Sequence, residues 1–198
     1  MTTVLEPDWE KELTEELDET WHVPHGLGEW VSTVDHKRIG MRYFYLGMVF
    51  FVVGGIQSLL IRTQLAGPDL DILSPEAFNQ LFTMHGVTMM FLFAMPVLSG
   101  FGNYFVPLMI GARDMAFPRL NAFAFWVLLG AGIFMYSSFA VGQAPDAGWF
   151  NYVPLAGADF TPGVNIDFYT LGLILLGVSS TGGAINFIVT ILKLRAPG

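Results

Sequence analysis

The chain has 198 residues, of which 53% are hydrophobic and only 13% are charged. This composition lies outside the usual range of soluble domains and indicates helices embedded in lipid. Cysteine is absent, which excludes disulfides, zinc ribbons and iron–sulfur clusters within this chain. The formal net charge is −8, but the acidic residues concentrate before Trp30, so no nucleic-acid surface is indicated.

Residues 1–29 form a predicted acidic cytoplasmic arm. Three apolar residues of the arm recur at helical spacing: Trp9, Leu13 and Leu17. They allow one short amphipathic helix, but the density of acids favours a solvated, partly disordered tail. His22 and His25 flank Pro24, which breaks a helix that would align them, so we interpret them as tail residues and not as a metal site. No basic segment precedes an apolar core, so we expect no cleaved signal peptide.

Residues 30–198 form the predicted membrane body, an all-α, multi-pass bundle. Four apolar segments are long enough to span a bilayer: 43–61, 77–112, 120–141 and 168–192. Pro96 and Pro107 are expected to kink and end the second span. A loop rich in proline and glycine, 142–167, lacks lysine and arginine and joins the third span to the fourth.

Basic residues predict the orientation of these spans. Those at one end of the bundle are Lys37, Arg38, Arg42, Arg113, Arg119, Lys193 and Arg195. The other two connections carry Arg62 alone. By the positive-inside rule, the N-terminus, the loop between the second and third spans and the C-terminus face the cytoplasm.

Between positions 77 and 112, His85 is the only residue among histidine, lysine, arginine, aspartate and glutamate. A neutral imidazole at membrane depth needs a partner, because an unpaired polar group in hydrocarbon costs several kcal/mol. A metal or a haem iron is one such partner, and Gly86 would let a flat macrocycle approach closely. If the second span enters from the outer face near Ala77, His85 lies ~12 Å along the helix axis, in the outer half of the bilayer.

Arg62 is the only basic residue near that outer face. Its side chain has two readings: it extends to lipid phosphates, or it meets a polar substituent of a haem held by His85. A shared depth of Arg62 and His85 favours the second reading.

A second polar set is predicted at the cytoplasmic face, where Asp114 lies in a short loop with Asn103 and Asn121 at the neighbouring span ends. The fourth span adds a helical stripe: Ser179, Gly183, Asn186 and Thr190. Such a stripe is typical of close helix packing. It is also compatible with an ordered chain of waters that conducts protons inward from Asp114. The spacing does not decide between these readings.

Several motifs occur together in one order: STVDHKRIG at 32–40, TMHG at 83–86, GFGNYFVPL at 100–108, DMAFPRLN at 114–121, and GVSS with GAINF at 177–187. From about Trp30 to Gly198 the chain resembles the N-terminal part of subunit I of the haem–copper oxidases, the cytochrome c oxidase family. The resemblance implies that His85 is an axial ligand of the low-spin, electron-transferring haem, of the haem a type, and that Arg62 meets its formyl group. It implies that Asp114 is the entrance of a proton-uptake channel. The implied lining residues are Asn103, Asn121, Ser179, Ser180 and Asn186.

The resemblance further implies a terminal respiratory oxidase that passes electrons from cytochrome c to oxygen and pumps protons. Subunit I of this family has about twelve helices, and the other axial histidine, the copper ligands and the high-spin haem ligand lie in the later ones. We therefore expect this chain to be a fragment that is incomplete alone. Its expected partners are the remaining helices, a copper-bearing subunit and further oxidase subunits, the electron donor and the lipid bilayer.

The chain departs from the family pattern at the lining of the proton-uptake channel and at an outer cation site. Ala124 and Leu176 stand where many members carry channel-lining serines, and Gln64 replaces an acid that some members use at the cation site. The alternatives are a quinol-oxidising subunit I and a non-catalytic four-helix membrane fragment. The acidic arm and the lack of a transit peptide favour a bacterial plasma membrane over a mitochondrial inner membrane.

Overall fold

The computed structural model describes residues 8–21 and 26–197. Contacts divide the chain into two units, residues 1–33 and residues 34–198. The first unit contains helix α1 (Asp8–Trp21) and the short helix α2 (Leu27–Ser32). Helix α1 corrects the prediction of a disordered tail, because its leucine, glutamate and lysine residues are strong helix formers. Trp9 is 64% exposed, and Leu13 and Leu17 are each 47% exposed. His22 and His25 lie outside the described residues.

All the regular elements among the described residues of the second unit are helices, which confirms the predicted all-α bundle. Its elements are α3 (His36–Gln64), α4 (Pro75–Val87), the π-helical segment η1 (Thr88–Ala94), α5 (Met95–Met109), α6 (Pro118–Val141) and α7 (Asn165–Lys193). Four stretches are long and apolar enough to cross a membrane: α3, the continuous run Pro75–Met109, α6 and α7. The four predicted spans are thus confirmed; the first, third and fourth helices are longer than their apolar segments, and the second runs from Pro75 to Met109 instead of 77–112.

Side-chain caps begin two of the spanning helices. The Asp35 carboxylate accepts hydrogen bonds from the backbone N–H groups of Lys37, at 2.8 Å, and Arg38, at 3.1 Å. The Ser74 hydroxyl accepts from the Ala77 N–H at 3.2 Å, and Pro75 fills the first turn of α4. These caps explain why the helices begin several residues before their apolar segments.

The second span changes its winding immediately before Pro96. The Met95 N–H donates to the Met90 carbonyl, five residues back, as in a π-helix. Proline offers no N–H to the carbonyl four residues earlier, and its ring displaces that carbonyl, so the wider turn accommodates Pro96. Helix α5 then continues through Pro107 and ends at Met109, two residues after the expected end.

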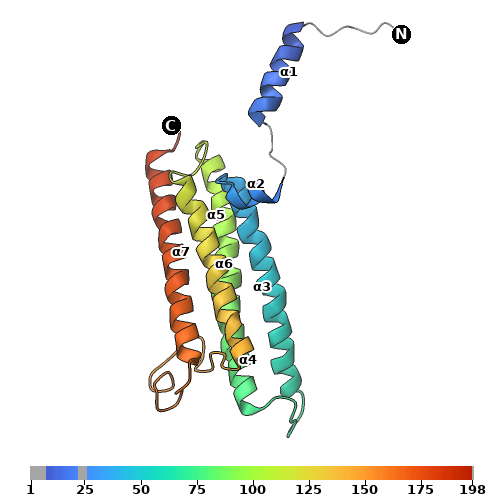
Figure 1. The fold of residues 1–198 in the computed structure, drawn as a ribbon, viewed down its shortest axis with the longest axis vertical. Coiled ribbons are helices and arrows are strands. Elements are labelled where there is room, and N and C mark those ends of the chain that lie inside the picture. Colours follow the sequence, from blue (N-terminus) through green and yellow to red (C-terminus); the bar gives the residue numbers. More distant parts are fainter. Residues whose placement is uncertain (1–7, 22–25, 198) are drawn as a thin grey trace, which may run out of the picture. The chain divides into compact units, whose positions relative to one another are not determined.

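The spanning helices lie side by side in two closely packed pairs (Figure 1). Helix α3 packs along α4, η1 and α5, whereas α6 packs along α7 and also contacts α3. The backbones of α3 and α5 approach closely at Gly40 and Gly100, because a Cβ on either residue would lie 2.8 Å from the carbonyl oxygen of the other. Between 28% and 39% of each spanning window is buried inside the chain, and α6 is the most enclosed. The remaining apolar surface suits lipid or further helices.

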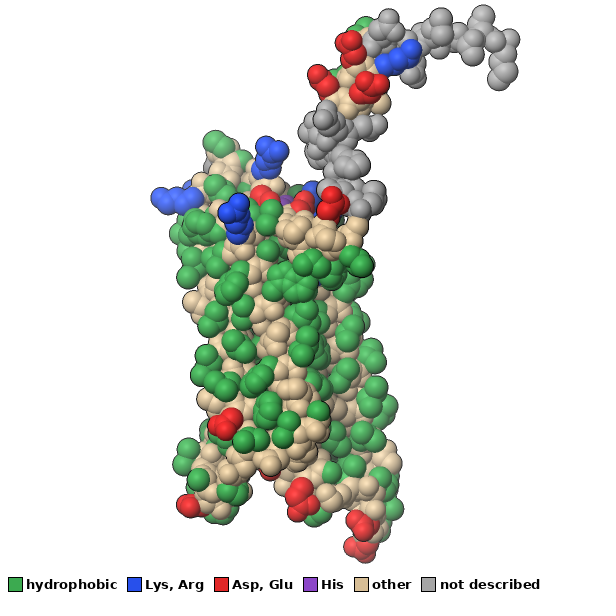
Figure 2. Space-filling view, in the orientation of Figure 1, with side chains coloured by type: hydrophobic (Ala, Val, Ile, Leu, Met, Phe, Trp, Pro, Cys, Tyr) green, Lys and Arg blue, Asp and Glu red, His purple; other side chains and the backbone are tan. Residues whose placement is uncertain are grey.

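Charges separate along the bundle axis. On the face that Figure 2 shows, lysine and arginine side chains of the helical body lie at the end where α3 begins and α7 ends, whereas acidic side chains lie at both ends. The basic end also contains the loop between α5 and α6, which carries Arg113.

Candidate functional site

His85 lies near the end of α4, and its ring is held by α3. Its Nδ1 is 2.9 Å from the carbonyl oxygen of Gly54. A carbonyl can only accept, so Nδ1 carries the proton and the lone pair of the neutral imidazole is on Nε2. Histidines that bind metals commonly donate their second ring N–H to a backbone carbonyl in this way. The ring is therefore set up to offer Nε2 as a ligand.

The arrangement around His85 suits a single axial ligand. The ring is half-buried in this chain. In the part of the chain that the structure describes, no group of three or more His, Cys, Asp or Glu side chains is placed to hold a metal ion. One histidine is enough for an axial position of a porphyrin iron, whereas a zinc or copper centre needs further ligands from the protein. These residues fit a haem and do not form a copper site.

Gly86 is covered by a side chain that the sequence did not place there. A Cβ on Gly86 would lie 2.8 Å from the Cβ of Trp149. Trp149 belongs to the loop between α6 and α7, which reaches α4 through a 3.0 Å hydrogen bond from the Gly148 N–H to the Thr83 hydroxyl. The Tyr169 hydroxyl also donates to the Trp149 carbonyl. The interpretation of Gly86 as a site of macrocycle approach is wrong, since its glycine is needed for the indole.

Arg62 lies in the last turn of α3, and its side chain is exposed. Gly54 is also in α3, and its hydrogen bond to His85 shows which turn of α3 lies level with that ring. Arg62 follows Gly54 by eight residues, which is ~12 Å along the helix axis. The two residues lie at the same end of the bundle but not at one depth. Because arginine has a long side chain, it can still approach a large planar group that begins at His85.

Gln64, two residues further, organises the turn that follows α3. Its Oε1 accepts from the N–H groups of Ile72, at 3.0 Å, and Leu73, at 2.8 Å, while its Nε2 donates to the Leu70 carbonyl. The amide that replaces the family's acid is thus occupied by the backbone between α3 and α4.

Asp114 lies in the loop between α5 and α6, against the first residues of α3. Its carboxylate accepts from the Met115 N–H at 2.6 Å and from the His36 backbone N–H. Burial raises the pKa of Asp114, and the nearby charge of Asp35 raises it further, while the two N–H donors and His36 act in the opposite direction. A carboxyl group with a raised pKa at the surface of a bundle is suited to take up and pass on a proton.

His36 is a site residue that the sequence reasoning missed. It is the first residue of α3 and only 2% exposed. Its Nδ1 donates to the Asn103 carbonyl at 2.8 Å, which ties α3 to α5 beside Asp114. The signal was present in the sequence, because Asp35 is a good N-cap and puts the next residue in the first helical turn.

The polar stripe of α7 binds the α5–α6 loop and α6. Asn186 accepts from the Phe117 N–H at 2.8 Å and donates to the Phe117 carbonyl at 3.1 Å. The Thr190 hydroxyl accepts from the Ala116 N–H at 2.9 Å. Ser179 donates to the Ala124 carbonyl at 2.6 Å. The hydrogen bonds of Asn186 and Thr190 thus pack α7 against the loop that carries Asp114.

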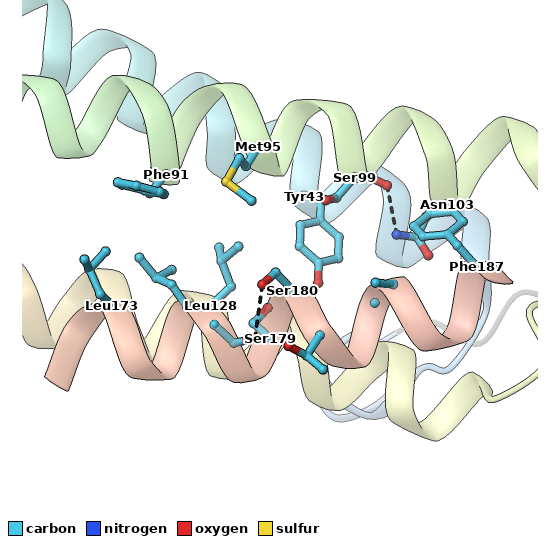
Figure 3. Close-up of a pocket in the computed structure, with 15 residues that line it drawn as sticks. Tyr43, Phe91, Met95, Ser99, Asn103, Leu128, Leu173, Ser179, Ser180 and Phe187 are labelled. Atoms are coloured by element: carbon cyan, nitrogen blue, oxygen red, sulfur yellow. Dashed lines mark hydrogen bonds between the residues drawn. The ribbon is translucent and has the colours of Figure 1, made fainter. Parts of the chain in front are cut away.

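A pocket of about 620 Å³ lies between part of α5 and α7 (Figure 3). Its lining includes three of the residues predicted for the proton path, Asn103, Ser179 and Ser180, whereas Asp114, Asn121 and Asn186 lie outside it. Tyr43, which the sequence analysis did not select, points its hydroxyl towards the two serines. Beyond these polar groups the lining is apolar: Phe91, Met95, Leu128, Leu173 and Leu176.

Two buried amides beside this pocket and the loop have an unsatisfied atom. The Oδ1 of Asn103 and the Nδ2 of Asn121 are buried without a hydrogen-bond partner in the structure. Buried amide groups of this kind commonly bind ordered water. Both residues lie on the Asp114 side of the bundle, in α5 and α6.

The fold and these two clusters define a multi-pass helical membrane protein with one candidate metal-binding histidine near one end and a polar track near the other. Residues 38–198 match the family described as cytochrome C and quinol oxidase polypeptide I. The chain belongs to this family.

Curated relatives of this chain come from several bacteria. Cytochrome c oxidase subunit 1 of a Bacillus species is 50% identical over 172 residues, which cover 87% of this chain and 28% of the relative. The subunit of Corynebacterium diphtheriae is 49% identical over 169 residues, which cover 85% of this chain and 30% of the relative. The subunit of Corynebacterium glutamicum is 47% identical over 182 residues, which cover 90% of this chain and 31% of the relative. The chain thus spans about 30% of the length of these relatives.

Proposed function

We propose that this chain forms the first four transmembrane helices of subunit I of a terminal respiratory oxidase. In the assembled enzyme it would contribute one axial ligand of the low-spin haem and the entrance of a proton-uptake channel. The observation that carries the proposal is the His85–Gly54 hydrogen bond, which leaves Nε2 as the available ligand atom in a member of this family. A bound haem supplies reversible one-electron transfer.

His85 and Arg62 have separate roles in this proposal. His85 offers Nε2 to the haem iron, and the Gly54 carbonyl fixes its tautomer and ring orientation. Arg62, at the same end of the bundle, donates to a polar substituent of the haem, the formyl group in a haem of the a type. The copper centre and the high-spin haem belong to later helices of subunit I, and the further partners are a copper-bearing subunit and the electron donor.

Asp114 is proposed as the proton entrance. Its raised pKa keeps the carboxyl protonated to higher pH, and Asn103 and Asn121 offer buried amide groups that can order water beyond it. Ser179 and Ser180 continue this path into the pocket, whereas Asn186 holds the loop in place. Protons are taken up at this end of the bundle and electrons arrive at the other. Each elementary charge moved across the membrane in this way stores ~2.3 kcal/mol for every 100 mV of membrane potential.

The orientation follows from the basic end of the bundle. Residues 1–33 and the α5–α6 loop face the cytoplasm under the positive-inside rule, and Arg62 faces outwards. The relatives reported above are bacterial, which supports a bacterial plasma membrane. Their names support cytochrome c as the donor. The family description also includes quinol oxidases, and a copper-bearing partner subunit in the purified complex would favour cytochrome c.

The test uses the complete oxidase with substitutions in this segment. For His85→Leu we expect loss of the low-spin haem absorbance, and Arg62→Gln should shift that absorbance without removing it. For Asp114→Asn we expect slower turnover and loss of proton pumping, whereas Asp159→Asn, in the loop at the other end, serves as the matched control. Native low-spin haem in His85→Leu, or native pumping in Asp114→Asn, would refute the respective assignment.

A further inference from the structure

Three polar side chains from three helices meet inside the apolar bundle, close to His85 but not among the site residues described above. The Nε2 of Gln57, in α3, donates to the Tyr136 hydroxyl of α6 at 3.3 Å. The Thr88 hydroxyl, at the start of η1, lies 2.5 Å from the same Tyr136 oxygen. Gln57 is 5% exposed and Thr88 is fully buried. We name these residues the Tyr136 cluster.

The Tyr136 cluster lies on the same helical turns as the His85–Gly54 hydrogen bond. Thr88 follows His85 by three residues, and its backbone N–H donates to the His85 carbonyl. Gln57 follows Gly54 by three residues, so it lies on the same face of α3. A Cβ on Gly54 would lie 3.5 Å from the Thr88 Cγ2, which means that α3 and the start of η1 are in direct contact at this point.

The winding of the second span changes at Thr88. Helix α4 ends at Val87 and the π-helical segment begins with Thr88, three residues after His85. A π-helical turn is a rare and weakly preferred conformation, so its register needs tertiary support. Tyr136 supplies that support from α6, because its hydroxyl contacts Thr88 on one side and Gln57 on the other.

The composition of the cluster argues against a role in packing alone. The Oε1 of Gln57 is buried without a hydrogen-bond partner in the structure. A buried acceptor left unsatisfied is destabilising, and an apolar side chain of similar size would avoid that penalty. A glutamine at this position is therefore better explained by its bond to Tyr136 than by stability.

We propose that the Tyr136 cluster is a positioning set for His85. It holds α3 and the start of η1 in one register, so that the Gly54 carbonyl stays bonded to Nδ1–H. A carbonyl that accepts from Nδ1–H increases the basicity of Nε2. A more basic axial ligand stabilises the ferric state of a haem and lowers its midpoint potential. This inference rests on the proposed function of His85 as a haem ligand.

Tyr136→Phe in the complete oxidase tests the inference, because it removes both hydrogen bonds and keeps the ring. We expect an unchanged content of low-spin haem but a higher midpoint potential. The ratio of reduced to oxidised low-spin haem at a fixed potential should rise by roughly three- to tenfold, where tenfold corresponds to about 59 mV for one electron. The electron paramagnetic resonance g-values of the ferric low-spin haem should move as well. Tyr45→Phe is the matched control, since Tyr45 is on α3 but 62% exposed.

Further variants keep the inference testable if Tyr136→Phe fails to assemble. Thr88→Val and Gln57→Met each remove one bond to Tyr136 and should shift the potential in the same direction, whereas Thr88→Ser keeps a hydroxyl and should restore the native value. Native potential and g-values in the variants that lack these bonds would overturn the inference. His85→Leu separates the two proposals. Retention of low-spin haem in His85→Leu refutes the ligand assignment itself, whereas its loss alongside native potentials in the cluster variants refutes only the positioning role.

Discussion

Asn186 was predicted as a lining residue of the proton path, and the structure assigns it two hydrogen bonds to Phe117. Asn186→Leu tests which role matters. The Phe117 carbonyl keeps a second donor, the Asn121 N–H at 3.0 Å, but the Phe117 N–H loses its acceptor. This hydrogen bond is part-buried, so its loss costs about 0.5–1.5 kcal/mol. We therefore expect the loop between α5 and α6 to open more often by the corresponding factor of about 2 to 13.

Amide hydrogen exchange of residues 110–117 measures this opening, because exchange in a locally unfolding segment reports its opening free energy. Proton uptake should slow in the same variant, since the loop carries Asp114. Ser137→Ala is the control: its hydroxyl bonds to the Phe134 carbonyl of its own helix, away from the loop and from the proposed path. Slow proton uptake with native exchange rates in Asn186→Leu would mean that the amide acts on water in the path and would refute the packing role.

Three further predictions concern single contacts. Asp35→Asn keeps the cap of α3 but removes a negative charge that raises the pKa of Asp114. The Asp114 carboxyl should therefore lose its proton at lower pH. Infrared difference spectra of the protonated carboxyl measure this change, and the control Asp71→Asn should leave the band unchanged. Gly86→Ala forces a methyl group against Trp149 and should destabilise the complex by about 1–3 kcal/mol. The control Gly130→Ala meets nothing within 4 Å and should be neutral or stabilising by up to about 1 kcal/mol. Equal melting temperatures of the two variants would contradict the packing of Trp149 on Gly86. Gln64→Leu frees the turn after α3 and should speed its proteolysis, while Glu76→Gln should not; equal cleavage rates would remove the role given to Gln64.

Several particular errors of the sequence reasoning have one cause. A one-dimensional pattern reports periodicity and residue type, but it does not say which surfaces meet. Gly86 was assigned to a macrocycle because the residue beside it is a histidine, yet the loop between α6 and α7 folds back and packs Trp149 on it. The π-helical segment before Pro96 was not predicted either, and its first residue, Thr88, contacts Tyr136 of α6.

The sequence alone determined the four spans, because hydrocarbon selects for long apolar helices whatever their neighbours are. Its motifs also led to the family, and His85 stood out because a lone imidazole in an apolar run needs a partner. Only the tertiary structure decided which partner each polar group has. In the folded chain His85 bonds to Gly54, His36 lies beside Asp114, and Asn186 bonds to the loop between α5 and α6. These contacts depend on the register and rotation of neighbouring helices, which no single segment specifies.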